Sequence, residues 1–330
     1  NSPMTTMVTL NYLNTAYSLL FHHLTIHLNF KMKKSIAILA LVFTISSCEK
    51  IIPFTGETTQ PKLVVNSLFE NQNRWSVHIS QSLSVLDTSS LSNIENATVR
   101  IMDDQNNLVE TLTHDFGGHY TGISFPILGE NYRIEAEASG FTAVYSENNL
   151  PSPISIISVD TNTTFVDDEE KLEMSITFSD PVNINNYYLV SVAAGGWFIN
   201  DYWNGSSWVI DSTFEEFSIP IQVDDPTFEN YGSNRWEDNG IFTDFSFDGQ
   251  NKTIDIAINS GEYEYKLDDL EYFEVRINNI TEAAYLYNKS YNLYQNASGN
   301  PFAQPVQVYS NVNQGFGIFA GSQLNVFSIL

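Results

Sequence analysis

Few residues in this chain could do covalent chemistry, and the most distinctive of them is Cys48, the one cysteine among 330 residues. A single thiol cannot form an intrachain disulfide or a cysteine-based metal cluster. It is therefore either an inert side chain or a nucleophile that accepts a covalent group. The sequence has no motif typical of nucleotide binding, serine hydrolysis or zinc proteolysis. We predict a protein that is not an enzyme and that uses no cofactor and no metal ion.

The segment before Cys48 has the composition of a secretory signal. Three lysines lie within residues 31–34, and residues 36–45 are apolar apart from Thr44. A positive segment followed by a short apolar one is typical of such signals. The apolar segment is shorter than the ~20 residues that a membrane-spanning helix needs. We therefore predict a signal peptide rather than a permanent transmembrane helix.

The residues next to the cysteine indicate which kind of signal this is. Ile45, Ser46 and Ser47, followed by Cys48, resemble the bacterial lipobox. This resemblance implies that the thiol of Cys48 receives a diacylglyceryl group and that Cys48 becomes the first residue of a membrane-anchored protein. The alternative is an ordinary signal with a cysteine there by chance. Residues 1–30 carry no acidic or basic side chain, and Met32 is a suitable start for the signal. We predict that residues 1–31 are upstream sequence, 32–47 the lipoprotein signal peptide and 48–61 a lipid-anchored tether.

The net charge of the chain argues against nucleic acid as a partner. The chain has 39 acidic and 14 basic residues, a net charge of -25. Such a surface repels the phosphates of nucleic acid, so we predict that no nucleic acid is bound. With 42% hydrophobic and 13% aromatic residues, the chain is too apolar for a disordered acidic protein. The part after Cys48 is long enough to build its own hydrophobic core.

Alternating apolar and polar residues predict a mainly β protein. The segments Y-R-I-E-A-E-A (residues 132–138), L-E-M-S-I-T-F-S (residues 172–179) and T-I-D-I-A-I-N (residues 253–259) show this alternation, which is typical of strands with one apolar face. About seven short strands within residues 62–150 predict an immunoglobulin-like antiparallel β-sandwich. The P-S-P segment at residues 151–153 is a suitable boundary. Residues 151–330 are then predicted to form a second β-rich domain.

One helix is predicted near the C-terminus. Residues 281–294 have helical periodicity, and Thr281 stands where it could cap the N-terminus. Tyr287, Tyr291 and Tyr294 share one face of this helix, and we predict that this face packs in the core.

A group of aromatic residues is the best candidate for a contact surface. The segment W-F-I-N-D-Y-W-N-G-S-S-W contains Trp197, Tyr202, Trp203 and Trp208 around Asn204-Gly205, a strong signal for a two-residue hairpin turn. Exposed aromatic side chains on such a hairpin could stack on a sugar ring or anchor a partner protein. The alternative, which the pattern favours, is cross-strand packing inside the sandwich.

Three acidic or histidine-containing segments resemble metal sites only weakly. Residues 167–170 and 224–225 are acidic but lack the spacing of a calcium-binding loop. His114, Asp115 and His119 lack a wider set of ligands. We interpret all of them as solvated surface.

An ordered series of short motifs resembles one known family. The motifs are P-K-L-V-V-N, N-A-T-V-R-I-M-D-D, G-G-H-Y-T-G, L-P-S-P-I-S-I, F-T-D-F-S-F-D-G-Q and N-V-N-Q-G-F-G. On these motifs, the chain from Cys48 to the C-terminus is similar to the Bacteroidota lipoproteins that contain domain of unknown function 4249. The resemblance implies an outer-membrane or surface lipoprotein, often encoded beside a TonB-dependent receptor, with no established activity and no catalytic residues to carry over. One departure is Gln314, where the family pattern has Gly.

Together these features predict a lipid-anchored lipoprotein on the periplasmic or cell-surface face of the outer membrane. We expect a non-enzymatic accessory or binding subunit beside a TonB-dependent receptor, in contact with the membrane through its N-terminal lipid. The alternative is an adhesin-like surface module that binds an extracellular glycan, peptide or protein.

Overall fold

The computed structural model divides the chain into two units, Asn1–Glu57 and Thr58–Leu330, and the fold described here is that of the second. The predictions for the signal peptide, for the lipobox and for lipidation of Cys48 fall outside the described residues. The structure describes residues 59–84, 87, 90–166, 169–229, 236–259, 270–298, 300 and 302–329.

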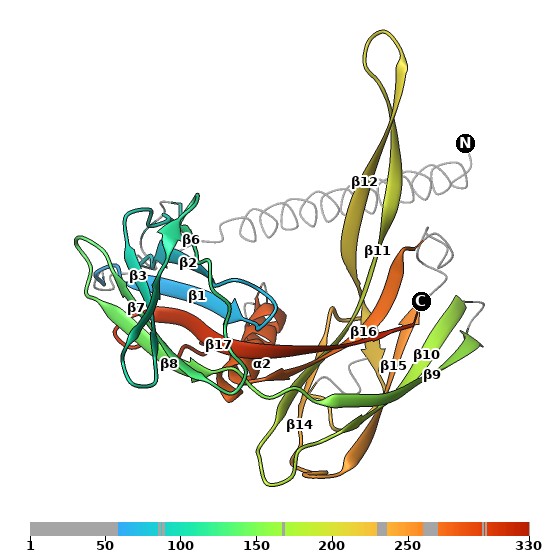
Figure 1. Cartoon of the computed structure of the whole chain (residues 1–330). Helices are drawn as coiled ribbons and strands as arrows, with labels where there is room; N and C mark the ends of the chain where they lie inside the picture. The colour runs from blue at the N-terminus through green and yellow to red at the C-terminus, as the bar shows by residue number, and fades with distance from the viewer. Residues whose placement is uncertain are drawn as a thin grey trace, which may run out of the picture. The chain divides into compact units, whose positions relative to one another are not determined.

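The described residues form seventeen strands and one α-helix, so the prediction of a mainly β protein with one helix near the C-terminus is confirmed (Figure 1). The first half contains β1 (Leu63–Phe69), β2 (Ser76–Gln81), β3 (Thr98–Asp103), β4 (Leu108–Thr111), β5 (Thr113–His114), β6 (His119–Thr121), β7 (Asn131–Glu137) and β8 (Val144–Asn149). The second half contains β9 (Ser155–Val166), β10 (Glu169–Ser179), β11 (Tyr187–Trp203), β12 (Trp208–Ile219), β13 (Ile221–Val223), β14 (Gly240–Thr243), β15 (Asn251–Asn259), β16 (Tyr272–Ile280), α2 (Glu282–Ala297) and β17 (Phe316–Ser328).

Three sheets organise these strands. The largest has nine strands in the order β12-β11-β16-β17-β1-β2-β6-β5, with β14 also paired to β11. Two four-stranded sheets, β4-β3-β7-β8 and β13-β15-β10-β9, complete the fold. Strand β17 pairs with β1 and with β16, so the C-terminal strand joins the two halves of the large sheet. The predicted domain boundary at residues 151–153 stays a prediction.

The first half is a sandwich, but it is not purely antiparallel as predicted. Strand β1 pairs in parallel with β17, from Val64 opposite Phe316 to Phe69 opposite Gly321. This pairing joins segments about 250 residues apart, and local alternation carries no information about such a distant neighbour. The core lies between this part of the large sheet and the β3–β7–β8 layer, with Trp75 and Phe319 fully buried at its centre. Gln314, just before β17, has a φ of 64°, which a Gly would adopt at lower cost.

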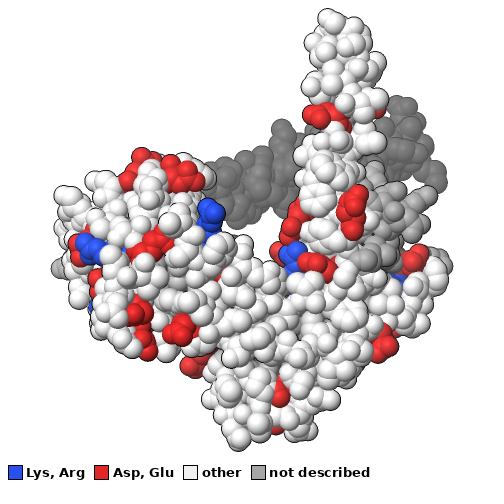
Figure 2. All heavy atoms as spheres, in the orientation of Figure 1, with Lys and Arg blue, Asp and Glu red and all other residues white. Residues whose placement is uncertain are grey.

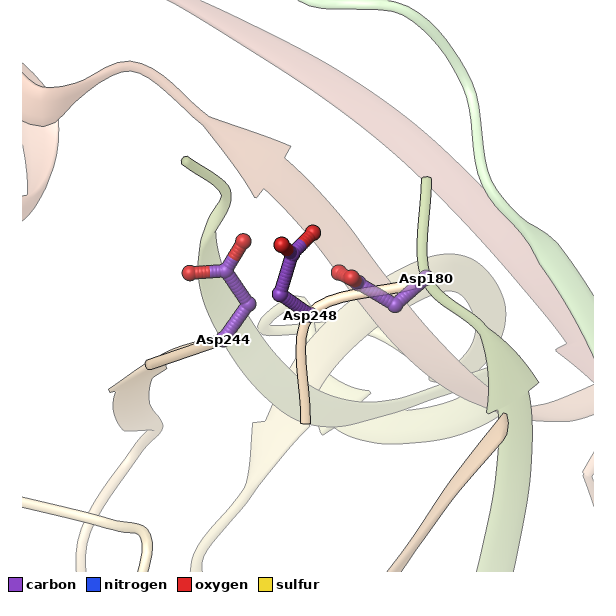
Figure 3. Close-up of side chains that lie close together, drawn as sticks. All are labelled: Asp180, Asp244 and Asp248. Atoms are coloured by element: carbon purple, nitrogen blue, oxygen red, sulfur yellow. The ribbon is translucent and has the colours of Figure 1, made fainter. Parts of the chain in front are cut away.

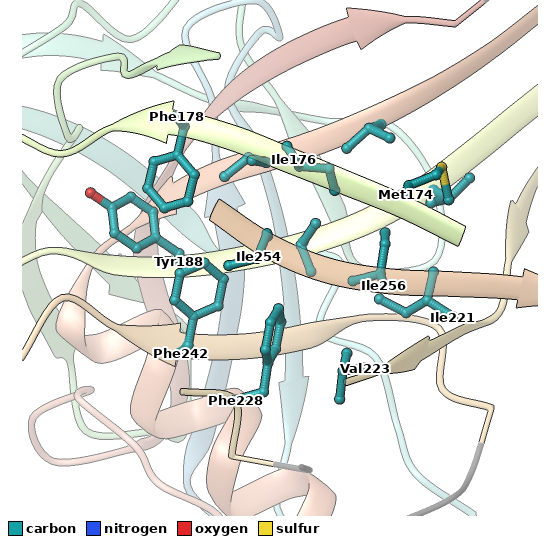
Figure 4. Close-up of a cluster of buried hydrophobic side chains, with 14 of the residues drawn as sticks. Met174, Ile176, Phe178, Tyr188, Ile221, Val223, Phe228, Phe242, Ile254 and Ile256 are labelled. Atoms are coloured by element: carbon teal, nitrogen blue, oxygen red, sulfur yellow. The ribbon is translucent and has the colours of Figure 1, made fainter. Parts of the chain in front are cut away.

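The second half has its own core (Figure 4). Alternate residues of β10, β15 and β11 point into it, among them Ile176, Ile254 and Tyr188. The segments predicted as strands at residues 172–179 and 253–259 are thus confirmed as β10 and β15. Because β11 alternates, Tyr188 and Val190 face this core, while Tyr187 and Leu189 pack with the cluster around α2.

Helix α2 begins after Thr281, as predicted, but Thr281 makes no side-chain capping bond. Its buried residues are Ala283, Ala284 and Tyr285. Tyr291 and Tyr294, predicted to face the core, are 39% and 45% exposed, so that prediction is wrong. The helix packs against β17, β11 and β14 with its first turns only. None of the helices in the described part of the chain is long and apolar enough to cross a membrane.

Candidate functional site

Strands β11 and β12 extend beyond the sheet that holds them. The pairing of β11 with β16 ends at Gly195, opposite Tyr272, whereas its pairing with β12 continues to Trp203, opposite Trp208. Residues 196–215 therefore form a two-stranded ribbon, which projects from the sheet in Figure 1. A two-stranded hairpin is marginally stable by itself, so this ribbon depends on the sheet at its base.

The turn at the tip of the ribbon has four residues, not the two that the Asn204-Gly205 signal predicted. Trp203 and Trp208 are the last register pair, and the side-chain oxygen of Asn204 accepts hydrogen bonds from the backbone N–H groups of Ser206 and Ser207, at 2.9 Å and 3.0 Å. Gly205 has a φ of 95°, a conformation that glycine adopts without steric cost. Asn204 thus closes the turn by an Asx-type bond rather than by a two-residue geometry.

One face of the ribbon is apolar and exposed. Side chains of directly opposed residues lie on the same face of an antiparallel pair, so the register groups the large apolar side chains of the two strands. Trp203 contacts Trp208 edge-to-face with ring centroids 6.0 Å apart, and Trp197 contacts Phe214 in the same way at 5.5 Å. The large apolar side chains of this face are those of Trp197 (57% exposed), Ile199 (71%), Trp203 (55%), Trp208 (67%), Ile210 (73%) and Phe214 (42%), and the face also carries Ser212 opposite Ile199 and Asp201 opposite Ile210.

The ribbon carries acidic side chains and no basic ones among its described residues. Asp201, Asp211 and Glu215 are its charged residues, and all three are exposed. Figure 2 shows a mostly uncharged projection with acidic groups only. Asp201 lies on the apolar face itself, opposite Ile210, so a partner surface that fits this face is apolar with a basic or hydrogen-bond-donating group opposite Asp201.

The structure brings three of the four predicted contact residues together. Trp197, Trp203 and Trp208 share the apolar face, while Tyr202 is 52% exposed on the opposite face. Their exposure favours the contact-surface interpretation over packing inside the sandwich. Sequence reasoning missed Ile199, Ile210 and Phe214. Pairing W-F-I-N-D-Y-W with W-V-I-D-S-T-F across the turn would have placed them on the same face.

A second candidate group is an acidic cluster at one end of the second core (Figure 3). Asp180 follows β10, Asp244 follows β14, and Asp248 lies in the turn before β15. One carboxylate oxygen from each lies within 4.8 Å of the others. Asp180 and Asp244 are each 5% exposed, whereas Asp248 is exposed.

Hydrogen bonds hold each carboxylate of this cluster. Asp180 accepts from the hydroxyl of Tyr188 and, at 2.7 Å, from the backbone N–H of Gly249. Asp244 accepts from the backbone N–H of Asn186 at 2.7 Å. Asp248 accepts in the same way from residue 183 at 2.8 Å. The cluster thereby ties the ends of β10, β14 and β15 to the start of β11.

Burial sets the electrostatics of the cluster. Burial raises the pKa of Asp180, against the hydrogen bonds that it accepts. Burial also raises the pKa of Asp244, and the neighbouring charges of Asp180 and Asp248 raise it further. None of the ion pairs between described residues involves these three carboxylates. Chemically, the group can hold a hard cation such as Ca²⁺ or share protons.

Among the residues that the structure describes, the metal candidates weighed from the sequence do not form a comparable group. His114 accepts a hydrogen bond from the N–H of Gly118 at 3.4 Å, while the ring of His119 lies against that of His78 with centroids 4.7 Å apart. Asp225 forms an ion pair with Lys252 at 2.8 Å. Residues 167–168 lie outside the described part. The acidic cluster was missed, although F-T-D-F-S-F-D-G-Q, which contains two of its members, had been noted as a family motif.

Comparisons with known proteins place this chain in a sequence family. The sequence model described as "Domain of unknown function (DUF4249)" matches residues 49–325. No curated protein matches the chain. A similar solved structure is titled "Biofilm associated protein - BSP domain", with 8% identity and a TM-score of 0.14, and the alignment covers 86% of this chain and 62% of that one. This chain thus spans less than two thirds of that structure, and a similarity this low carries no argument about function.

Proposed function

This chain belongs to the DUF4249 family, and we propose that it is a non-enzymatic binding protein, held at the bacterial outer membrane by a lipid on Cys48. Its partner is a TonB-dependent receptor, which it contacts through the apolar face of the β11–β12 ribbon. The observation that carries the proposal is that face, with six large apolar side chains exposed on a projecting two-stranded element.

The composition of the ribbon supports a protein partner. Soluble proteins rarely expose large contiguous apolar patches unless these bind something. Tryptophan is enriched among the residues that dominate binding energy at interfaces, and Trp197, Trp203 and Trp208 all lie on this face. Because Trp197 and Phe214 contact each other, as do Trp203 and Trp208, the rings are held in place before binding. Holding them in advance reduces the entropy lost on association.

The lipid anchor rests on sequence alone. Ile45, Ser46, Ser47 and Cys48 resemble a lipobox and follow a short apolar segment. Changing Cys48 to Ala should move the protein from the membrane fraction to the soluble fraction, whereas Ser47→Ala, which keeps a small residue beside the thiol, should leave it in the membrane. Retention of the Cys48→Ala variant in the membrane would contradict the proposed anchor.

The ribbon contact is tested by co-purification from solubilised membranes. The wild-type chain should retain a TonB-dependent receptor, and the double variant Trp203→Ala/Trp208→Ala should lose most of it. A matched control is Phe165→Ala, which truncates an aromatic side chain that is 72% exposed on β9, outside the ribbon. Equal retention by the double variant and the control would overturn the ribbon assignment.

An adhesin-like role on extracellular glycan or protein is the second candidate, favoured by the exposed ring faces of the Trp203 and Trp208 pair. It predicts that no receptor co-purifies with the wild-type chain, and that the double variant instead reduces binding of cells to a glycan- or protein-coated surface.

A further inference from the structure

A cavity of about 640 Å³ lies where the two halves of the second unit meet α2. Five parts of the chain line it: Gly129 before β7, the end of β8 with the connection to β9, the loop before β11 with Tyr187, the junction of β16 with α2, and residues 309 and 311. Its volume is in the range of small-molecule sites. Neither the ribbon nor the three acidic residues of the cluster belong to its lining.

Two buried polar atoms in the lining have no hydrogen-bond partner among the described residues. They are Oδ1 of Asn186 and Oγ1 of Thr281, on residues that are 5% and 7% exposed. A buried polar group without a partner costs free energy, about 1–3 kcal/mol in proteins. Thr281 stands at the N-cap of α2, yet its hydroxyl makes no capping bond. A hydroxyl group of a bound molecule that reached either atom would supply the missing hydrogen bond.

Neighbouring bonds fix the position of the Asn186 acceptor. Its backbone N–H donates to Asp244 at 2.7 Å, and its side-chain amide donates to Oδ1 of Asn279 at 3.5 Å. Asn279 is in turn held by its own donation to the carbonyl of Ser152 at 2.9 Å. These hydrogen bonds orient the side chain of Asn186, whose Oδ1 is the atom left without a partner.

The charges around the cavity disfavour anionic ligands. The described lining residues include no Lys, Arg or His, and the charged ones are Glu147 and Glu282. Glu147 is already paired with Arg133 at 2.8 Å, and Glu282 is exposed. The first-turn N–H groups of α2, which have no partner within the helix, are further donors at this site. Because the described lining has no basic side chain, the repulsion between Glu282 and a phosphate or carboxylate ligand is offset by these N–H groups alone.

Aromatic side chains complete the lining. Tyr187 and Tyr309 are both half-buried and both border the cavity. Tyrosine offers an apolar ring face beside a polar end. The lining thus combines fixed acceptors, free donors and aromatic carbon, with no positive charge.

We propose that this cavity binds a neutral carbohydrate unit. A sugar hydroxyl both donates and accepts, so it can donate to Oδ1 of Asn186 while another pairs with Oγ1 of Thr281. The C–H face of the ring lies against Tyr187 or Tyr309. This site is separate from the ribbon, so the protein carries a small-ligand site in addition to its partner surface.

The test uses the full chain and a panel of methyl glycosides of glucose, galactose, mannose, xylose and N-acetylglucosamine. Binding is followed by saturation-transfer NMR and calorimetry. At least one neutral glycoside should bind saturably, and Thr281→Val should weaken that binding about tenfold without lowering the thermal unfolding midpoint, because the lost hydroxyl has no partner in the protein. Thr281→Ser, which keeps the hydroxyl, should retain binding. Thr121→Val, at an exposed position of β6, is the matched control.

Several outcomes would overturn the proposal. One is the absence of saturable binding by every neutral glycoside with a Kd below about 10 mM. Another is tighter binding of glucuronate or galacturonate than of the neutral sugars. A third is unchanged affinity in Thr281→Val. If Trp203→Ala/Trp208→Ala abolished sugar binding, the sugar would lie on the ribbon instead; loss of receptor contact in that double variant with sugar binding intact is the result expected when both proposals hold.

Discussion

The two ends of β11 have the same residue pattern and opposite surroundings. At its base, Tyr188, Val190 and Val192 alternate inward and are fully buried. Beyond Gly195 the large apolar side chains lie on the other face of the strand, the one that carries Tyr187 and Leu189 at the base, and there Trp197 and Trp203 are more than half exposed. The difference is that the β10–β15 layer covers the base and contributes to its core, while the ribbon face is contacted at its lower end by the ring of Tyr272 of β16, 6.3 Å from that of Phe214, and is exposed towards the tip.

The contrast between the base and the ribbon concerns two separate properties: which side chains share a face of a strand, and whether that face is buried. Alternation decides which side chains share a face of a strand. Whether that face is buried depends on a second layer, which comes from residues far away in the chain. A face with the composition of a core and little covering it is a candidate contact surface.

The largest effect should come from truncating a tyrosine at the base. Tyr188→Ala removes a ring that contacts Phe178 and Phe242 and a hydroxyl that donates to Asp180. We expect a loss of about 3–5 kcal/mol in the free energy of unfolding, as for other buried aromatic truncations. The matched Tyr202→Ala variant, on the ribbon of the same strand, should cost less than about 1 kcal/mol. Urea unfolding measures both, and equal losses would mean that the ribbon is packed like the base.

Local alternation was enough to predict the strands of the fold but not their distant neighbours. Residues 172–179 and 253–259 were recognisable as β10 and β15 because each alternates by itself. The parallel pairing of β1 with β17 leaves no local signature, because it depends on a contact between the two ends of the fold.

The candidate sites show the same limit. The aromatic residues of the ribbon were visible in one short segment, but their common face required the register across the turn. The acidic cluster unites Asp180 with Asp244 and Asp248, which lie more than sixty positions later in the chain. The orphaned hydroxyl of Thr281 was read as a helix cap, because sequence gives the position of a cap and not the direction of its side chain.

The next effect tests the point where base and ribbon meet. A Cβ atom added to Gly195 would lie 2.4 Å from Cε1 of Tyr272, which is too close for two non-bonded carbon atoms. We expect Gly195→Ala to cost about 1–3 kcal/mol through this overpacking. In a Tyr272→Ala background the same substitution should be nearly neutral, because the obstructing ring is gone. A double-mutant cycle measures this coupling; equal costs in both backgrounds would show that Gly195 is needed for another reason.

A smaller effect on stability should come from the titration of Asp244, beside the base of β11. The pKa of Asp244 is raised by burial and by its acidic neighbours. The folded state therefore holds this proton more tightly than the unfolded state does. The contribution of the protonated Asp244 to the free energy of unfolding is fully present below the pKa that this group has in the unfolded state. It is lost as the pH rises through the pKa of the folded state.

The variant Asp244→Asn makes that contribution independent of pH. It should be more stable than the wild type at pH 7, and the advantage should shrink towards pH 3. Its side-chain oxygen can still accept from the N–H of Asn186. Thermal melts across this pH range, in chelator, measure the difference. A wild type that becomes more stable than the variant when Ca²⁺ is added would instead assign the cluster to a cation.

The smallest effect on folding is expected on the ribbon face. Ile199→Thr and Ile210→Thr keep β-branched side chains, which suit a strand, but remove apolar surface from residues that are 71% and 73% exposed. Each should change the free energy of unfolding by less than about 0.5 kcal/mol, while the pair should reduce receptor retention in the co-purification assay. Val192→Thr, at a buried position of the same strand, is the matched control and should be clearly destabilising, because it buries a hydroxyl in an apolar core. Similar losses at the exposed and buried positions would show that the apolar face of the ribbon is already covered within the molecule, and the distinction between the two ends of β11 would fail.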